Sequence, residues 1–186
     1  MVRTTARTHP DAEIQVWVQD EARFGQHGTL TRVWARRGSR PTAIKQNEYE
    51  SLYVLGAACP ATGQSVGFIS PTLNTAVVNH FLEEMSQELA PGVFALLVWD
   101  QAGYHTSKDL RIPANIGVLH LPPYSPELNP IENLWHYLRS HHGSNRLYTD
   151  YTALLDAATD AWKKVCLDPA RIRSVCAKPY LMLGTN

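Results

Sequence analysis

A continuous apolar run from Val93 to Trp99 is the feature that most constrains how this chain can fold. The run follows Pro91 and Gly92 and ends at Asp100. A segment that is apolar on both faces is typical of a central parallel strand, because both of its faces must be covered by other elements. Open α/β sheets bind ligands beyond the carboxyl ends of such strands, so we expect Asp100 to lie in a functional site.

A second segment, residues 121–138, combines four prolines with the apolar spacing of a helix. Asn129 is a natural N-cap for this helix, and Pro130 suits its first position. Glu132 is then expected in the first helical turn. The spacing of Asn129 and Glu132 also fits a capping box, in which the glutamate bonds back to the amide of the cap residue. The carboxylate of Glu132 therefore has two alternative roles, one in a site and one in a cap.

The rest of the chain predicts strands before the apolar run and helices around it. Alternating apolar residues predict strands over residues 14–20, 30–36, 51–59 and 65–69, and a short apolar stretch predicts another over residues 116–121. Helical spacing predicts helices over residues 77–89 and 150–165, with a short helical segment over residues 107–111. Residues 1–12 show no periodicity, so we expect a flexible N-terminal head before one domain over residues 13–186.

Antiparallel strands followed by a helical crossover to parallel strands predict an α/β chain with an RNase H-like fold, in which helices flank a mixed central sheet. In that topology the first strand and the Val93–Trp99 strand are neighbours, which places Asp20 beside Asp100. If the helix end that carries Glu132 faces the same point, the three carboxylates form a cluster. Each pair of charges about 4 Å apart repels by on the order of 4 kcal/mol at an effective dielectric constant of about 20, so the cluster requires cations.

Carboxylate oxygens are hard ligands that favour Mg²⁺ or Mn²⁺, and these ions keep coordination positions for water and phosphate oxygens. Two such ions roughly 3.5–4 Å apart can activate a water or hydroxyl on one side of a phosphodiester and stabilise the leaving oxygen on the other. We therefore predict two-metal phosphoryl transfer at Asp20, Asp100 and Glu132. An aspartate at a strand end is also a common turn former, which leaves a structural role open for each residue taken alone.

Charge, cysteine content and the length of apolar runs limit which kinds of protein this chain can be. Seventeen basic and seventeen acidic residues give zero formal net charge, so no global positive field indicates a nucleic-acid partner. The three cysteines lack C-x-x-C spacing, which argues against a disulfide framework or structural zinc. The chain has no apolar run long enough to cross a bilayer and no secretion signal at its start, so we expect an intracellular protein without a membrane partner.

Several basic side chains are candidate contacts to DNA phosphates, although each has a structural alternative. His105, in the turn after Asp100, could contact the scissile phosphate, orient Asp100 or bond to the backbone. Arg139 lies about two turns beyond Glu132 on the same helix face. The arginine cluster either contacts phosphates or forms a solvated face, and it comprises Arg32, Arg36, Arg37 and Arg40.

Four motifs together resemble the catalytic domain of DDE transposases of the mariner superfamily and related bacterial insertion sequences. The motifs are D-E-A-R-F from Asp20, V-W-A-R-R-G-S-R-P from Val33, V-W-D-Q-A-G-Y-H from Val98 and L-P-P-Y-S-P-E-L-N-P-I-E-N-L-W from Leu121. The resemblance implies a metal-binding triad at Asp20, Asp100 and Glu132. It further implies cleavage by water at transposon ends, attack of the freed 3′-hydroxyl on target DNA, a homo-oligomer assembled on DNA, and location in the bacterial cytoplasm.

The chain departs from the family pattern at two points. The family commonly has asparagine after the second aspartate, where this chain has Gln101, a longer amide that can still orient Asp100 or the substrate. Members usually carry helix-turn-helix domains before the catalytic domain, and the nineteen residues before Asp20 are too few for one. We therefore expect the catalytic half of a split or truncated transposase, with a separate DNA-binding half as a partner. The alternatives are an RNase H-like nuclease without strand transfer, and an inactive or adopted remnant that acts as a binding module.

Overall fold

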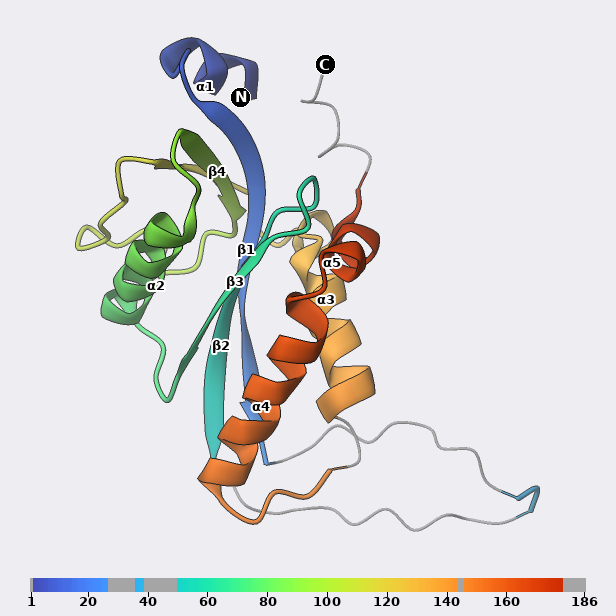
Figure 1. Cartoon of the computed structure of the whole chain (residues 1–186). Helices are drawn as coiled ribbons and strands as arrows, with labels where there is room; N and C mark the ends of the chain where they lie inside the picture. Colours follow the sequence, from blue (N-terminus) through green and yellow to red (C-terminus); the bar gives the residue numbers. More distant parts are fainter. Residues whose placement is uncertain (1, 27–35, 39–49, 144–145, 179–186) are drawn as a thin grey trace.

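The computed structural model describes residues 2–26, 36–38, 50–143 and 146–178. It contains a five-stranded mixed sheet in the order β3-β2-β1-β4-β5, with helices on both faces (Figure 1). The strands are β1 (Glu13–Gly25), β2 (Ser51–Ala58), β3 (Ser65–Ser70), β4 (Val93–Trp99) and β5 (Ile116–His120). The first three pair antiparallel, whereas β4 runs parallel to β1 and β5 runs parallel to β4. The predicted RNase H-like arrangement is confirmed.

The helices are largely those that the apolar spacing predicted. They are α1 (Val2–Thr8), α2 (Thr75–Glu88), α3 (Ile131–Leu138), α4 (Tyr151–Cys166) and α5 (Pro169–Cys176), with a short 3₁₀ turn η1 (Pro126–Leu128) and a π-helical turn η2 (Arg139–Gly143). The side chains of Asn74, Asp150 and Asp168 accept hydrogen bonds from the first turns of α2, α4 and α5, which fixes where these helices begin. Within the described residues no helix has the length and apolarity needed to cross a membrane.

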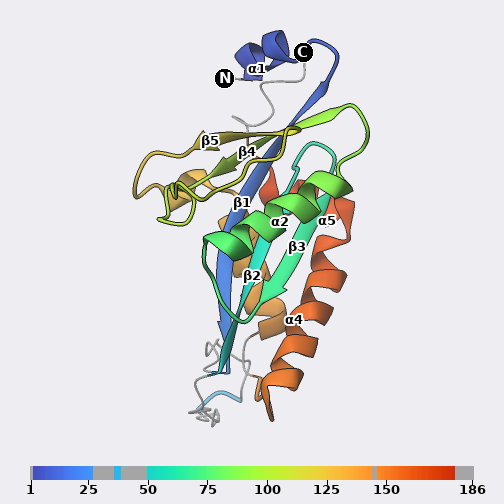
Figure 2. The ribbon, with the colours of Figure 1, turned by 90° about the vertical axis from the view of Figure 1, so that its left-hand side faces the viewer.

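Two apolar cores lie on opposite faces of the sheet. On one face lies α2 (Figure 2). Its Phe81 and Leu82 side chains are buried in a core that includes Trp17 of β1. On the other face Trp135 of α3 packs in a core that includes Val18 of β1. Each fully buried side chain of this size contributes roughly 1.5–3 kcal/mol. Because neighbouring residues of a strand point to opposite faces, the consecutive residues Trp17 and Val18 of β1 belong to different cores.

Two glycines in the sheet allow indole rings to lie directly on it. Gly56 of β2 pairs with Asp20 on one side and with Gly67 of β3 on the other. A Cβ atom at Gly56 would lie 2.6 Å from the Trp135 ring, and one at Gly67 would lie 2.3 Å from the Trp162 ring. Any side chain at Gly56 would therefore displace Trp135 from its position next to Asp20.

The first strand extends further than the sequence predicted. It was expected to end at Asp20, but β1 continues to Gly25, where Gly25 still pairs with Ser51 of β2. Pairing with β4 stops earlier, at Val18 opposite Val98. Pairing with the antiparallel strand β2 continues beyond the end of the pairing with β4, so Asp20 lies inside a strand and not at its terminus.

Three other local predictions have different outcomes. The segment expected to be an irregular head contains α1, and whether residues 1–12 are flexible stays a prediction. Residues 107–111, expected to be helical, form turns, because the Asn79 side chain of α2 bonds to the backbone of Asp109 and Arg111. The strand predicted over residues 30–36 lies outside the described residues except for Arg36.

Candidate active site

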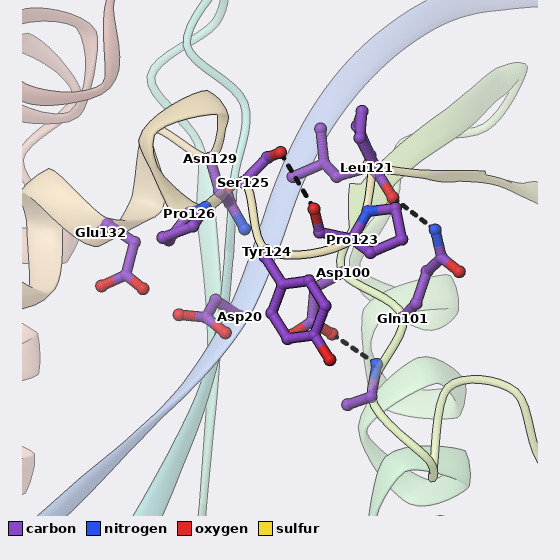
Figure 3. Close-up of a pocket in the computed structure, with 12 residues that line it drawn as sticks. Asp20, Asp100, Gln101, Leu121, Pro123, Tyr124, Ser125, Pro126, Asn129 and Glu132 are labelled. Atoms are coloured by element: carbon purple, nitrogen blue, oxygen red, sulfur yellow. Dashed lines mark hydrogen bonds between the residues drawn. The ribbon is translucent and has the colours of Figure 1, made fainter.

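Three carboxylates from separate elements line one pocket with a volume of about 430 Å³ (Figure 3). Asp20 comes from β1, Asp100 follows the last residue of β4, and Glu132 lies in the first turn of α3. Val18 and Val98 are partners in the parallel pairing, so two further residues on each chain bring the two aspartates to the same level of the sheet. The structure therefore brings together the three acidic residues that the sequence selected.

Asp20 is held between the sheet and α3. Its Oδ2 atom accepts a hydrogen bond of 3.0 Å from the indole Nε1–H of Trp135. Burial, and then the charges of Glu21 and Glu132, raise the pKa of Asp20 to about 7, against the lowering effect of hydrogen bonds from the Glu21 backbone and Trp135. The repulsion by Glu21 and Glu132 is the part of this shift that a nearby cation would relieve.

Asp100 is fixed by two donors on the other side of the pocket. Its Oδ1 atom accepts from the Ala102 N–H at 2.9 Å and lies 2.8 Å from Nδ1 of His105. The other ring nitrogen of His105, Nε2, lies 3.0 Å from Oε1 of Glu21. The residue His105 is 2% exposed, and its ring stacks on Trp99 with the ring centroids 4.0 Å apart. Of the roles predicted for His105, orientation of Asp100 fits this arrangement, and contact with the scissile phosphate stays a prediction.

Glu21 is the buried anchor of this hydrogen-bonded chain. Its side chain is 3% exposed. Besides His105, it accepts from Nε2 of Gln19 at 2.7 Å and from the Tyr104 hydroxyl at 3.0 Å. Burial lowers the pKa of His105, but the hydrogen bonds and charges of Glu21 and Asp100 outweigh it and leave that pKa raised. Burial and Glu21 also raise the pKa of the Tyr104 hydroxyl.

Sequence reasoning passed over Glu21 and Tyr104 as members of the site. The signal for Glu21 was present, because strand alternation sends it to the opposite face from Asp20. Whether that face holds donors depends on the path of the turn after Asp100, which no local pattern specifies. The same applies to the contact of Trp135, whose indole N–H donates to Asp20.

Asn129 connects the start of α3 to the central strand. Its Nδ2 atom donates to the Gln19 carbonyl at 2.8 Å, one residue before Asp20. The Asn129 backbone N–H donates to the Pro126 carbonyl at 2.9 Å, so the amide that a capping-box glutamate would bind is already bonded. The helix begins at Ile131, one residue later than predicted, after Pro130. The Asn129 Oδ1 atom accepts from the Ile131 N–H at 3.4 Å, so its side chain still bonds to the first turn of the helix. The carboxylate of Glu132 lines the pocket instead of closing a cap.

Gln101 has a role that the sequence did not predict. Its Nε2 atom donates to the Leu121 carbonyl at 2.8 Å, so the amide holds the proline-rich loop in place (Figure 3). It was expected to orient Asp100 or the substrate. The loop that it anchors, residues 121–126, forms one wall of the pocket.

The predicted phosphate-binding arginines do not gather at the pocket in the part of the chain that the structure describes. Arg36 and Arg37 are exposed, and Arg139 is partly exposed at the end of α3. None of these three lines the pocket. Arg32 and Arg40 lie outside the described residues. Contact of these arginines with DNA stays a prediction.

The donor set fits a hard divalent cation, although the site is not closed around one. Among the described residues no group of three or more His, Cys, Asp or Glu side chains forms a ready-made metal site. Mg²⁺ is commonly bound by one or two carboxylates, with water and substrate phosphates completing its octahedron. Asp20, Asp100 and Glu132 offer such oxygens in one polar pocket, and the charge of Glu132 already acts on Asp20. The predicted tight cluster is therefore corrected to an open set that a cation could draw together.

Comparison with known sequences finds relatives of this chain. A family model for DDE superfamily endonucleases matches residues 15–155. An uncharacterized protein, y4pE/y4sA, of Sinorhizobium fredii is 38% identical over 123 residues, which cover 66% of this chain and 91% of that protein. The Tc3 transposase of Caenorhabditis elegans is 28% identical over 162 residues, 81% of this chain and 49% of the transposase. The chain thus spans about half the length of Tc3 transposase.

Comparison of structures agrees with the fold. The Mos1 mariner paired end complex with Mn is similar with a TM-score of 0.68 at 16% identity, over 94% of this chain and 54% of that chain. The corresponding complex with Mg has a TM-score of 0.67 at 17% identity, over 87% of this chain and 51% of that chain. At such low identity the likeness establishes a shared fold.

Proposed function

Since the chain belongs to the DDE superfamily of endonucleases, we propose that it is a transposase catalytic domain that cleaves DNA strands and transfers the cut end to target DNA. The observation that carries the proposal is the pocket lined by Asp20, Asp100 and Glu132. The proposal is supported by the similarity to Tc3 transposase and to Mos1 complexes that contain Mg or Mn.

In the proposed reaction Asp20, Asp100 and Glu132 hold two Mg²⁺ or Mn²⁺ ions. When bound, such ions activate a water or a 3′-hydroxyl and stabilise the leaving oxygen. The protein fixes the direction of its carboxylates: Trp135 holds Asp20, and His105 holds Asp100 from a buried position. Pre-oriented ligands reduce the reorganisation that the reaction requires.

The same carboxylates repel DNA when no cation is bound. A phosphodiester that enters the pocket brings another negative charge beside Asp20 and Glu132, whose mutual repulsion already contributes to the raised pKa of Asp20. Binding of DNA at this pocket should therefore depend on divalent cation. Any affinity that remains in EDTA reflects other surfaces of the chain.

The decisive experiment follows a labelled DNA strand with a free 3′-hydroxyl in the presence of a supercoiled plasmid and Mg²⁺ or Mn²⁺. We expect metal-dependent nicking of the plasmid and joining of the label to it. Asp100→Asn and Glu132→Gln should abolish both products. Asp156→Asn, which alters an exposed carboxylate on α4, is the matched control and should retain both.

The products separate the proposal from its alternatives. Nicking without joining would identify a nuclease that hydrolyses DNA but does not transfer strands. Absence of both products, together with absence of Mg²⁺ binding by calorimetry, would contradict catalysis and favour a binding module. We also propose a dimer or larger assembly on DNA, to be measured by analytical ultracentrifugation with and without DNA.

A further inference from the structure

Tyr124 combines a strained backbone with a side chain that contributes no burial to the fold. Among the described residues it is the sole non-glycine residue with a positive φ, 57°. This left-handed conformation favours glycine or asparagine, because a Cβ atom crowds the neighbouring carbonyl. Its side chain is also 101% exposed, more than any other large apolar residue of the described chain. The ring of Tyr124 is thus held in water by a strained backbone.

The loop that carries Tyr124 is anchored at both ends. Leu121 donates its N–H to the Trp99 carbonyl at 2.8 Å and accepts from Gln101 at 2.8 Å. At the other end Asn129 donates to the Gln19 carbonyl at 2.8 Å. Pro122, Pro123 and Pro126 restrict the φ angles between these anchors. The position from which the Tyr124 side chain leaves the backbone is therefore set by anchors to the sheet.

The ring lies at the carboxylate pocket. Tyr124 lines the same pocket as Asp20, Asp100 and Glu132. In Figure 3 its side chain extends from the loop and is seen between Asp20 and Gln101. No hydrogen bond or ring contact joins it to another residue in the part of the chain that the structure describes. Both faces of the ring are open to a ligand that reaches the carboxylates.

We propose that Tyr124 is a stacking platform for an unpaired nucleobase beside the phosphodiester that the carboxylates act on. This inference rests on the proposed function, because that function places a DNA backbone in the pocket. Every base offers an aromatic face, so an exposed ring on an anchored loop binds a base without selecting its sequence. A base inside a duplex is already stacked on both sides. The platform therefore favours a substrate whose base has left the duplex or lies in a single strand.

The test compares binding of a short fluorescein-labelled single strand with binding of a blunt duplex of the same sequence. Affinity is measured by fluorescence anisotropy in Mg²⁺, and gels confirm that the strands stay intact. Tyr124→Ala should weaken single-strand binding roughly 5- to 150-fold and duplex binding less than about twofold. Tyr124→Phe retains the ring and should bind as the parent does. Leu167→Ala removes an exposed apolar side chain at the end of α4 and is the matched control.

Melting temperatures distinguish the loss of a stacking ring from a general loss of structure. Tyr124→Gly removes both the ring and the strain, so it should melt at a higher temperature than Tyr124→Ala while binding the single strand equally weakly. Unchanged single-strand affinity in Tyr124→Ala, or equal losses for single strand and duplex, would overturn the stacking role alone. If the parent protein binds neither DNA, the proposed function itself fails, and the stacking role falls with it.

Discussion

The burial of Asp20 and the charges beside it make the stability of the folded protein depend on pH. The pKa of this carboxyl is raised from 3.8 to about 7, chiefly by burial and then by the charges of Glu21 and Glu132. The folded protein therefore favours the protonated form, whereas the unfolded chain releases the proton near pH 4. Stability that the protonated carboxyl provides at low pH is lost as pH rises through this window.

Asp20→Asn tests this link. The amide is neutral at every pH, so the variant should lack the loss of stability between about pH 4 and about pH 7. A shift of roughly three pKa units corresponds to about 4 kcal/mol as an upper value. In urea unfolding without metal, we expect the variant and the parent to be similar near pH 4 and the variant to be clearly more stable near pH 8. A difference that does not change with pH would contradict the raised pKa.

His105 is a second residue whose contacts predict a measurable coupling. His105→Phe keeps an aromatic ring against Trp99 but removes both contacts to carboxylates. Loss of a donor to the buried Glu21 should cost roughly 2–4 kcal/mol of stability. Glu21→Gln removes the buried charge, so the double variant should regain part of that loss. Strict additivity in urea unfolding of the two single variants and the double variant would show that His105 and Glu21 are not coupled.

At the scale of elements, the position of α3 depends on the lack of a side chain on β2. The Trp135 ring of α3 lies over Gly56, and Gly56 is the β2 partner of Asp20. Asn129 ties the beginning of the same helix to β1. The position of α3 is thus determined by the contact of Trp135 with Gly56 and by the hydrogen bond of Asn129 to Gln19, both next to Asp20. This arrangement determines where Glu132 lies.

Gly56→Ala tests the close approach. The added methyl would meet the Trp135 ring at 2.6 Å, so the helix or the indole must move. We expect a loss of roughly 1–3 kcal/mol in thermal or urea unfolding and a weaker response to Mg²⁺, because the carboxylates on β1 and α3 separate. Gly103→Ala is the control, since nothing lies within 4 Å of its added Cβ atom. Equal effects of the two substitutions would contradict this account.

At the scale of the whole molecule, metal binding should stabilise the fold by mass action. A ligand at about 100 times its dissociation constant adds about 2.7 kcal/mol. For a chain of this size, this corresponds to a rise in melting temperature of roughly 5–10 °C. We expect such a rise with Mg²⁺ or Mn²⁺ for the parent and for Asp156→Asn. Glu132→Gln, which relieves repulsion on Asp20, should be more stable than the parent without metal and respond less to it.

Failure of metal to change the melting temperature of the parent would contradict a cation site in the pocket. An equal response in Glu132→Gln would mean that the cation binds elsewhere on the molecule. Calorimetric titration of the same variants with Mn²⁺ measures cation binding directly, without relying on how the protein unfolds.

The sequence by itself determined the elements whose pattern is local. The apolar run of β4, the spacing of α2 and the motif around Glu132 each predicted their structure, because the side chains of one segment carry the signal. The order of these elements then predicted the sheet, since parallel strands require a crossover and neighbouring strands align their ends. The selection of Asp20, Asp100 and Glu132 followed from that order.

Tertiary structure alone decided how those carboxylates are held. The contact of Glu21 with His105, the bond from Trp135 to Asp20 and the bond from Gln101 to Leu121 join residues 84, 115 and 20 positions apart. Such contacts depend on the path of turns and on the close approach of layers, which leave no periodic signal in the chain. The exposure of Tyr124 is likewise decided by tertiary structure, because the positive φ angle of this residue occurs in a loop anchored at both ends.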